Sequence, residues 1–180
     1  MRFTLLLPIG AFLPSMGIAA PAATSSVSST QAADDKSLYQ RDNLCSLKSP
    51  PALCQPDPSV TVEETAERAY KFYRAFVVDG DPKTMFSLID STYKNTSQQH
   101  HPGYADGPNT IWSLFCNGRP AGSAASSSWC FDASTNMSYA QYSTVDRWRW
   151  LDGCVHEHWD VGEKMPAKDK CYKLSTDSAS

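Results

Sequence analysis

The chain has 180 residues, of which 41% are hydrophobic and 19% charged, and its formal net charge is −3. Its 16 Lys and Arg residues are scattered and form no basic stripe that could neutralise phosphates, so a nucleic acid partner is not expected. Once an N-terminal signal is removed, about 160 residues remain, which is enough for one hydrophobic core and too few for two ordinary domains.

The N-terminus has the pattern of a secretory signal peptide. Residues 1–19 begin with a charge at Arg2, continue through an apolar stretch and end in small residues up to Ala19, which predicts cleavage after Ala19. A transmembrane anchor is the alternative, but Pro8 and Pro14 interrupt a stretch that is already short, and no basic cluster flanks it. We therefore expect a secreted protein without membrane attachment after cleavage.

Cysteine usage agrees with an oxidising compartment. An even number of cysteines without a Cys-x-x-Cys motif predicts three disulfides and no metal site. Nearest neighbours are the favoured partners because short loops cost little entropy to close, and Cys116 with Cys130 brackets a Gly/Ser-rich loop. Sequons at Asn95 and Asn136 predict glycans at the surface of a glycoprotein. The six cysteines are Cys45, Cys54, Cys116, Cys130, Cys154 and Cys171.

The segments that follow differ in composition. Residues 20–37 are mostly Ala, Ser and Thr without apolar periodicity, which is typical of a disordered linker. Residues 38–59 contain two cysteines and four prolines, so we predict an irregular arm pinned by a disulfide. A single domain is predicted over residues 60–174, followed by a flexible tail at 175–180.

Helical signals dominate the first half of this domain. Thr61 and Glu64 fit a capping box, and apolar residues follow at helical spacing. Asp81 and Pro82 fit the N-cap and first turn of a short second helix. Pro108 opens a third helix that stops at an Asn-Gly pair. The predicted helices span residues 60–79, 81–89 and 108–118.

The second half changes to strand signals. Residues 139–150 are rich in aromatic and β-branched types and predict one long strand. Asp152-Gly153 predicts a tight hairpin turn, and residues 155–161 would pair back as an antiparallel strand. Because helices come first and strands after, the sequence predicts an α+β fold.

The return strand mixes polar and aromatic side chains on both of its predicted faces. A strand that merely separates core from water would not do so, which indicates that one face borders a polar cavity. A solvated His/Asp face and a His-x-His metal pair are the two other readings, the latter with weak candidates for further ligands. Period-two geometry places His156, His158 and Asp160 on one face and Val155, Glu157 and Trp159 on the other.

Two segments carry a resemblance to a known family. The run DRWRWLDGCVHEHWD, residues 146–160, resembles the terminal hairpin of SnoaL-like polyketide cyclases, with its aromatic-Arg pair, Asp-Gly turn and Glu-His-Trp-Asp run. Tyr93, the segment Gln99-His100-His101-Pro102 and the pair Asp106-Gly107 are similar to the family's elements before its third helix. The resemblance covers residues 60–166 and suggests a secreted, fungal-type member.

The resemblance implies a fold of the nuclear-transport-factor type. In it, a cone-like, curved antiparallel sheet is packed by about three N-terminal helices and encloses an apolar pocket. Family members include cyclases, isomerases and lyases of secondary metabolism that use no cofactor, and also plain binding proteins. The family's habit of pairing sheets makes a homodimer a reasonable assembly.

The resemblance also suggests site residues. Asp160 matches the acid that shuttles a proton in the cyclases, and His100 matches the pocket histidine, although a hydrogen-bonded loop histidine is an equal reading. His158 is a lesser candidate, whereas His101, Tyr104 and Asp106 are expected to shape the loop. The expected pocket-lining residues are Trp112, Tyr142, Trp148, Trp150 and Trp159.

The function expected from these features is cofactor-independent chemistry. No nucleophile elbow, phosphate loop or dinucleotide fingerprint occurs in the sequence. We therefore expect a cyclase, isomerase or lyase that acts by acid–base chemistry on a hydrophobic, polyketide- or terpenoid-like small molecule. The alternative is a secreted, non-catalytic protein that binds a small molecule or a partner.

Overall fold

The computed structural model describes residues 44–95, 105–118 and 126–175. The predicted signal peptide and linker, His100, His101 and Tyr104 lie outside these described residues. Within them, no helix is both long enough and apolar enough to cross a membrane. The described elements are helices and one mixed sheet, which confirms the α+β class.

The first long helix begins where the capping box predicts. Helix α2 (Val62–Tyr73) is preceded by Thr61, whose side-chain oxygen accepts a hydrogen bond from the Glu64 amide at 3.2 Å. The Glu64 carboxylate in return accepts from the Thr61 amide at 2.8 Å. The chain continues as a π-helical turn, η1 (Arg74–Asp79), and ends at Gly80 with a φ of 62°, a left-handed conformation that glycine adopts without strain.

The second helix is shorter than the sequence pattern predicts. Helix α3 (Pro82–Phe86) is capped by Asp81, which accepts a hydrogen bond from the Thr84 amide at 3.1 Å. Instead of extending the helix, the following residues form strand β1 (Ile89–Lys94). Pairing of β1 in the sheet buries Ile89 almost completely, so tertiary packing overrides the local helical pattern. Helix α4 (Pro108–Phe115) follows the prediction for the third helix.

Five strands form one sheet in the order β1-β5-β4-β3-β2. Neighbouring strands run antiparallel except β1 and β5, which are parallel, so the expectation of a purely antiparallel sheet is wrong. The predicted long strand is in fact a hairpin of two strands. The chain reverses at residues 142–144, where the Tyr142 amide donates a hydrogen bond to the Thr144 carbonyl at 2.9 Å. The remaining strands are β2 (Ser128–Asp132), β3 (Met137–Gln141), β4 (Val145–Leu151) and β5 (Cys154–Trp159).

The predicted turn between β4 and β5 is confirmed, and a bulge follows it. Asp152 and Gly153 both have positive φ, 48° and 75°, as a two-residue hairpin turn requires. Pairing then shifts, with Trp150 opposite Val155 but Arg149 opposite Glu157, so one extra residue is inserted in β5. The bulge turns Val155 to the inner face, and the predicted grouping of Val155 with Glu157 is wrong.

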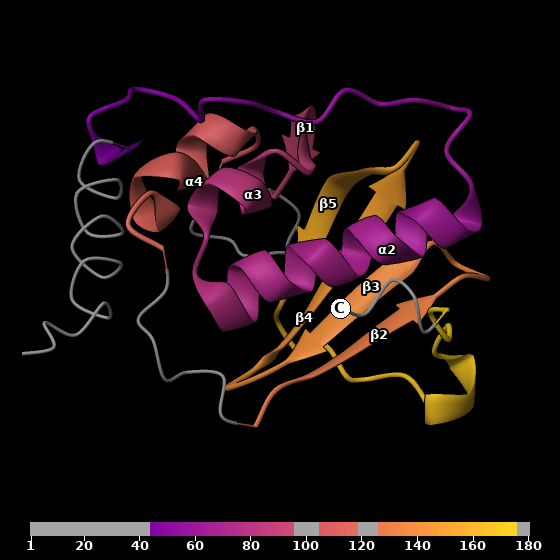
Figure 1. Ribbon diagram of the computed structural model, residues 1–180. Helices are drawn as coiled ribbons and strands as arrows, with labels where there is room; N and C mark the ends of the chain where they lie inside the picture. The colour runs from indigo at the N-terminus through magenta and orange to yellow at the C-terminus, as the bar shows by residue number, and fades with distance from the viewer. Residues whose placement is uncertain (1–43, 96–104, 119–125, 176–180) are drawn as a thin grey trace, which may run out of the picture.

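Helix α2 lies across one face of the sheet, and α3 and α4 lie beside it near β1 (Figure 1). The core forms where this helix layer meets the inner face of β4. The Phe72 ring lies 5.1 Å from Trp148 and 6.1 Å from Trp150, both edge-on. Trp148 and Trp150 alternate with half-buried arginines along β4, so this strand presents aromatic rings inward and guanidinium groups outward.

All six cysteines are paired, but not with their nearest neighbours. Cys116 does not pair with Cys130, because Cys116 at the end of α4 joins Cys45, and Cys130 of β2 joins Cys171. Cys54 forms a parallel bridge to Asp90 in β1, which brings it beside the start of β5 at Cys154. Three disulfides fit an extracellular protein. The pairs are Cys45–Cys116, Cys54–Cys154 and Cys130–Cys171.

Candidate functional site

A cavity of about 210 Å³ lies between the helices and the inner face of the sheet. Its apolar wall comes from both layers, and its polar side chains come from the ends of β1, β4 and β5 and from the turn before β4. The apolar wall consists of Phe72, Phe76, Met85, Ile89, Ile111, Phe115 and Trp148. The polar cluster consists of Tyr93, Asn95, Tyr142, Asp146, His158 and Asp160, with Thr144 beside it.

Strand pairing brings the central members of the polar cluster together. Asp146 and Trp148 share the inner face of β4 because they are two residues apart, and His158 lies directly opposite Trp148 on β5. The imidazole and indole rings stack with their centroids 5.4 Å apart. Asp160 follows immediately after the last residue of β5 and lines the same cavity.

The imidazole of His158 lies between two oxygen atoms. Its Nε2 is 3.4 Å from Oδ2 of Asp146, and its Nδ1 is 3.3 Å from Oδ1 of Asn95. Oδ2 of Asp146 also accepts a hydrogen bond from the Tyr142 hydroxyl. An amide oxygen only accepts hydrogen bonds, so the contact with Asn95 uses Nδ1–H, and the other ring nitrogen faces the Asp146 carboxylate.

Asn95 is held in place from the neighbouring loop. Its backbone amide donates a hydrogen bond to Oδ1 of Asp106 at 2.6 Å, which agrees with the loop-shaping role predicted for Asp106. Asn95 is only 1% exposed, so the surface position that a glycan needs is not present at this sequon in the folded chain. The second sequon residue, Asn136, is half-buried and donates its side-chain amide to the Trp150 carbonyl at 2.8 Å.

Tyr93 is the buried phenol of the polar cluster. Burial, together with the nearby carboxylates of Asp146 and Asp160, raises the pKa of Tyr93 well above its ordinary value of 10.0, because both effects disfavour the phenolate. Its hydroxyl therefore keeps its proton at any physiological pH. A neutral phenol in a cavity wall is a hydrogen-bond donor for an oxygen atom of a bound molecule.

The structure brings together only part of the predicted site. Asp160, His158, Tyr142 and Trp148 line the cavity, whereas three of the predicted lining tryptophans lie elsewhere. Trp112 packs edge-on against Phe86 and donates Nε1–H to the Leu47 carbonyl at 3.0 Å. Trp150 donates its indole N–H to the Ser138 hydroxyl at 2.8 Å. Trp159 lies on the outer face of the sheet, where the Arg147 guanidinium is 4.3 Å from the centre of its ring.

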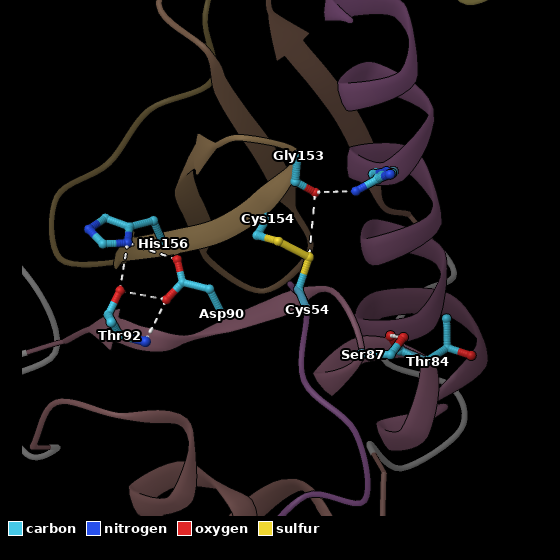
Figure 2. The surroundings of a disulfide bond; sticks show 9 residues. Cys54, Thr84, Ser87, Asp90, Thr92, Gly153, Cys154 and His156 are labelled. Atoms are coloured by element: carbon cyan, nitrogen blue, oxygen red, sulfur yellow. Dashed lines mark hydrogen bonds and ion pairs between the residues drawn. A yellow bond between two sulfur atoms is a disulfide. The ribbon is translucent and has the colours of Figure 1, made fainter. Parts of the chain in front are cut away.

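His156 does not share the environment of His158. Figure 2 shows its ring beside Asp90 and Thr92 of β1, near the Cys54–Cys154 disulfide, where Nδ1 lies 2.8 Å from Oδ2 of Asp90. Thr92 donates both its amide and its hydroxyl to the other oxygen of Asp90. The bulge in β5 separates the two histidines, so His156 ties the parallel strands together instead of facing the cavity.

The sequence reasoning assigns no role in the cavity to Asp146, Tyr93 or Asn95, although Asp146 and Tyr93 lie within the segments that carry the resemblance. The signal was present, since Asp146 belongs to the period-two series that continues with Trp148 and Trp150, and a carboxylate in such a series predicts a buried charge with a partner. His158 was available as that partner, but only the register of β4 and β5 pairs them.

In the part of the chain that the structure describes, no group of three or more His, Cys, Asp or Glu side chains is arranged to hold a metal ion. The His-x-His pair accordingly gains no further ligand there.

No protein-family model matches the chain, and no curated protein or solved structure matches it significantly. The function has to be inferred from the cavity and its polar cluster.

Proposed function

We propose that this chain is a secreted protein of the SnoaL-like type that performs cofactor-independent acid–base chemistry, as an isomerase, lyase or cyclase, on a hydrophobic small molecule. One observation carries the proposal: the carboxylates of Asp146 and Asp160 and the imidazole of His158 line a cavity whose remaining wall is mostly apolar and aromatic. Ionisable groups in such surroundings are typical of proton-transfer sites.

The positions of the polar side chains in the cavity support the following roles. Asp160 is the candidate base: its carboxylate takes a proton from a carbon atom next to a substrate carbonyl, and the C–H electron pair moves onto the carbonyl oxygen. The neutral phenol of Tyr93 donates a hydrogen bond to that oxygen. In a β,γ-unsaturated carbonyl substrate, return of this proton from Asp160 to the γ-carbon moves the double bond into conjugation and completes an isomerisation, so no external reagent is consumed.

His158 and Asp146 form the second acid–base pair. With Asn95 on one nitrogen and Asp146 on the other, the imidazole has a fixed orientation, and a proton on Nε2 can be shared with the carboxylate. This pair can supply a proton to a leaving hydroxyl group, as a lyase requires, or to a developing alkoxide, as a cyclase requires. Which of these occurs depends on the bound molecule.

The test uses a simple carbonyl compound as a probe. 4-Methylacetophenone in D₂O should exchange its acetyl protons for deuterium faster with the folded protein than without it, as followed by NMR. Asp160→Asn should lower the protein-dependent rate by roughly 10²- to 10⁴-fold, the range typical of a general base. Asp169→Asn, which alters an exposed carboxylate outside the cavity, is the matched control and should leave the rate unchanged.

Three results would contradict the catalytic proposal in different ways. Saturable binding of the probe without any exchange would identify a binding protein, the alternative that the apolar wall alone also supports. If neither binding nor exchange occurs for any compact aromatic ketone, the cavity is not a ligand site for this class. A lower melting temperature of Asp160→Asn with unchanged exchange would assign Asp160 a structural role.

A further inference from the structure

A second, much smaller hollow of about 10 Å³ lies next to the cavity. Phe76, Met85 and Phe115 line both spaces, so their side chains form a partition between them. The remaining wall of the hollow comes from the segment around Gly80 and from Gly118. The large cavity therefore ends, on this side, at a layer one side chain thick.

Three different elements supply the partition. Phe76 comes from the π-helical turn η1, Met85 from α3 and Phe115 from α4. The rings of Phe76 and Phe115 meet edge-on with their centroids 5.5 Å apart, an arrangement that favours a close, fixed contact. Phe76 and Met85 are buried, while Phe115 is half-buried, so Phe115 is the member that can be shortened with least damage to the core.

Two glycines form part of the wall behind the partition. Gly118 follows α4 with a φ of +70°, and a Cβ atom placed on it would lie 2.2 Å from the Gly80 carbonyl oxygen. The two glycines thus let the end of η1 and the end of α4 meet directly. Shortening a partition side chain opens the cavity into this hollow, whereas the glycine contact keeps the surrounding framework in place.

We propose that the partition of Phe76, Met85 and Phe115 limits the length of the molecule that this cavity accepts, and that the accepted class is a compact carbonyl compound or alcohol with one ring. The inference rests on the proposed function. An apolar cavity of about 150 Å³ holds one benzene molecule, so 210 Å³ accommodates a ring with short substituents. The polar cluster supplies partners for one oxygen atom.

A homologous series measures this limit. We would titrate the protein with 4-alkylacetophenones, from methyl to hexyl, and follow binding by calorimetry. In the unaltered protein the affinity should rise about fourfold per methylene group, as expected for burial of apolar surface, and then fall once the chain reaches the partition. Phe115→Ala should move that cut-off to chains longer by roughly three methylene groups, because a deleted phenyl ring leaves a cavity of about that size.

Leu114→Ala is the matched control. Leu114 is the neighbouring residue on α4, is 48% exposed and lines neither space. The longest alkyl chain that the Leu114→Ala variant binds should therefore equal that of the unaltered protein. Phe115→Leu preserves most of the packing and should give an intermediate cut-off, which keeps the proposal testable if Phe115→Ala does not fold.

The outcomes separate this inference from the proposed function. An unchanged cut-off in both Phe115 variants, with binding intact, would overturn the partition and leave the proposed function standing. Faster association without a longer cut-off would also overturn it, because Phe115 would then guard an entrance. If the unaltered protein binds no member of the series, the proposed ligand site itself is wrong.

Discussion

At the scale of single residues, the polar cluster is defined by how each buried polar group is partnered. Burying a carboxylate is costly unless hydrogen bonds or a counter-charge replace its water. Asp146 is buried, and it has the Tyr142 hydroxyl and the His158 imidazole as neighbours. Tyr93 avoids the cost of a buried charge because its phenol keeps its proton. These residues therefore combine a phenol that donates a hydrogen bond with a buried carboxylate that faces an imidazole.

Tyr93 gives a prediction about alkaline pH. Its folded-state pKa lies above the ordinary value of 10.0, so the unfolded chain loses this proton at a lower pH than the folded chain does. The resulting contribution to stability is fully present below about pH 10 and is lost as the pH rises further. Urea unfolding at pH 8 and near pH 11 should show a smaller loss of stability for Tyr93→Phe than for the unaltered protein. Equal losses would contradict the assigned environment of Tyr93.

At the scale of elements, the sequence predicted those features that depend on neighbouring residues. The capping box at Thr61, the Asp81 cap and the Asp152-Gly153 turn are local chemistry, and all three are confirmed. Strand β1 was missed because its pairing with β5 joins segments more than 60 residues apart, and nothing local distinguishes Ile89 from a helical residue.

In the candidate site, too, the sequence predicted the features that depend on neighbouring residues and missed those that depend on strand pairing. The motif resemblance selected Asp160 and His158, and both line the cavity. It could not select Asp146 as the neighbour of His158, because that contact depends on the register of two strands. The bulge in β5 also reversed the expected position of Val155. A single inserted residue changes which face a side chain occupies, and its location is set by tertiary packing.

The turn between β4 and β5 gives a prediction at this scale. Gly153 and Gly162 both have a positive φ, +75° and +77°, so alanine at either position costs about 1 kcal/mol of backbone strain. At Gly153 the new Cβ would also lie 2.7 Å from Nη1 of Arg68 and 2.9 Å from Val60, whereas nothing lies within 4 Å at Gly162. Gly153→Ala should therefore lower the free energy of unfolding more than Gly162→Ala does. Equal costs in urea denaturation would show that the packing of α2 on this turn contributes nothing.

At the scale of the whole molecule, the disulfides fasten peripheral segments to the sheet and to α4. Cys45 attaches the N-terminal arm to the end of α4, Cys54 attaches it to the start of β5, and Cys171 attaches the C-terminal segment to β2. The Tyr172 amide also donates to the Phe131 carbonyl of β2 at 2.7 Å. These links hold in place the segments around the layers that enclose the cavity, which suits a small secreted domain with a limited core.

The three disulfides should differ in how readily they are reduced in the folded protein. Their sequence separations are 71, 100 and 41 residues, and loop entropy distinguishes such lengths by less than about 1 kcal/mol. The access of the reductant to the sulfur atoms therefore decides the order in which the three disulfides are reduced. Cys54 and Cys154 are both buried, at 7% and 0% exposure, whereas Cys45 and Cys171 are half-buried.

Limited treatment with a phosphine reductant, followed by alkylation and peptide mass spectrometry, should find Cys45–Cys116 and Cys130–Cys171 opened before Cys54–Cys154. The same treatment in denaturant is the control, because unfolding exposes all six cysteines and should remove the order. Early loss of Cys54–Cys154 under native conditions would contradict the burial of this pair between the arm and β5. Cys54 pairs with β1 through Asp90. Early loss of this disulfide would therefore also mean that the β1 edge of the sheet opens before the rest of the molecule. This edge supplies Tyr93 and Asn95 to the cavity.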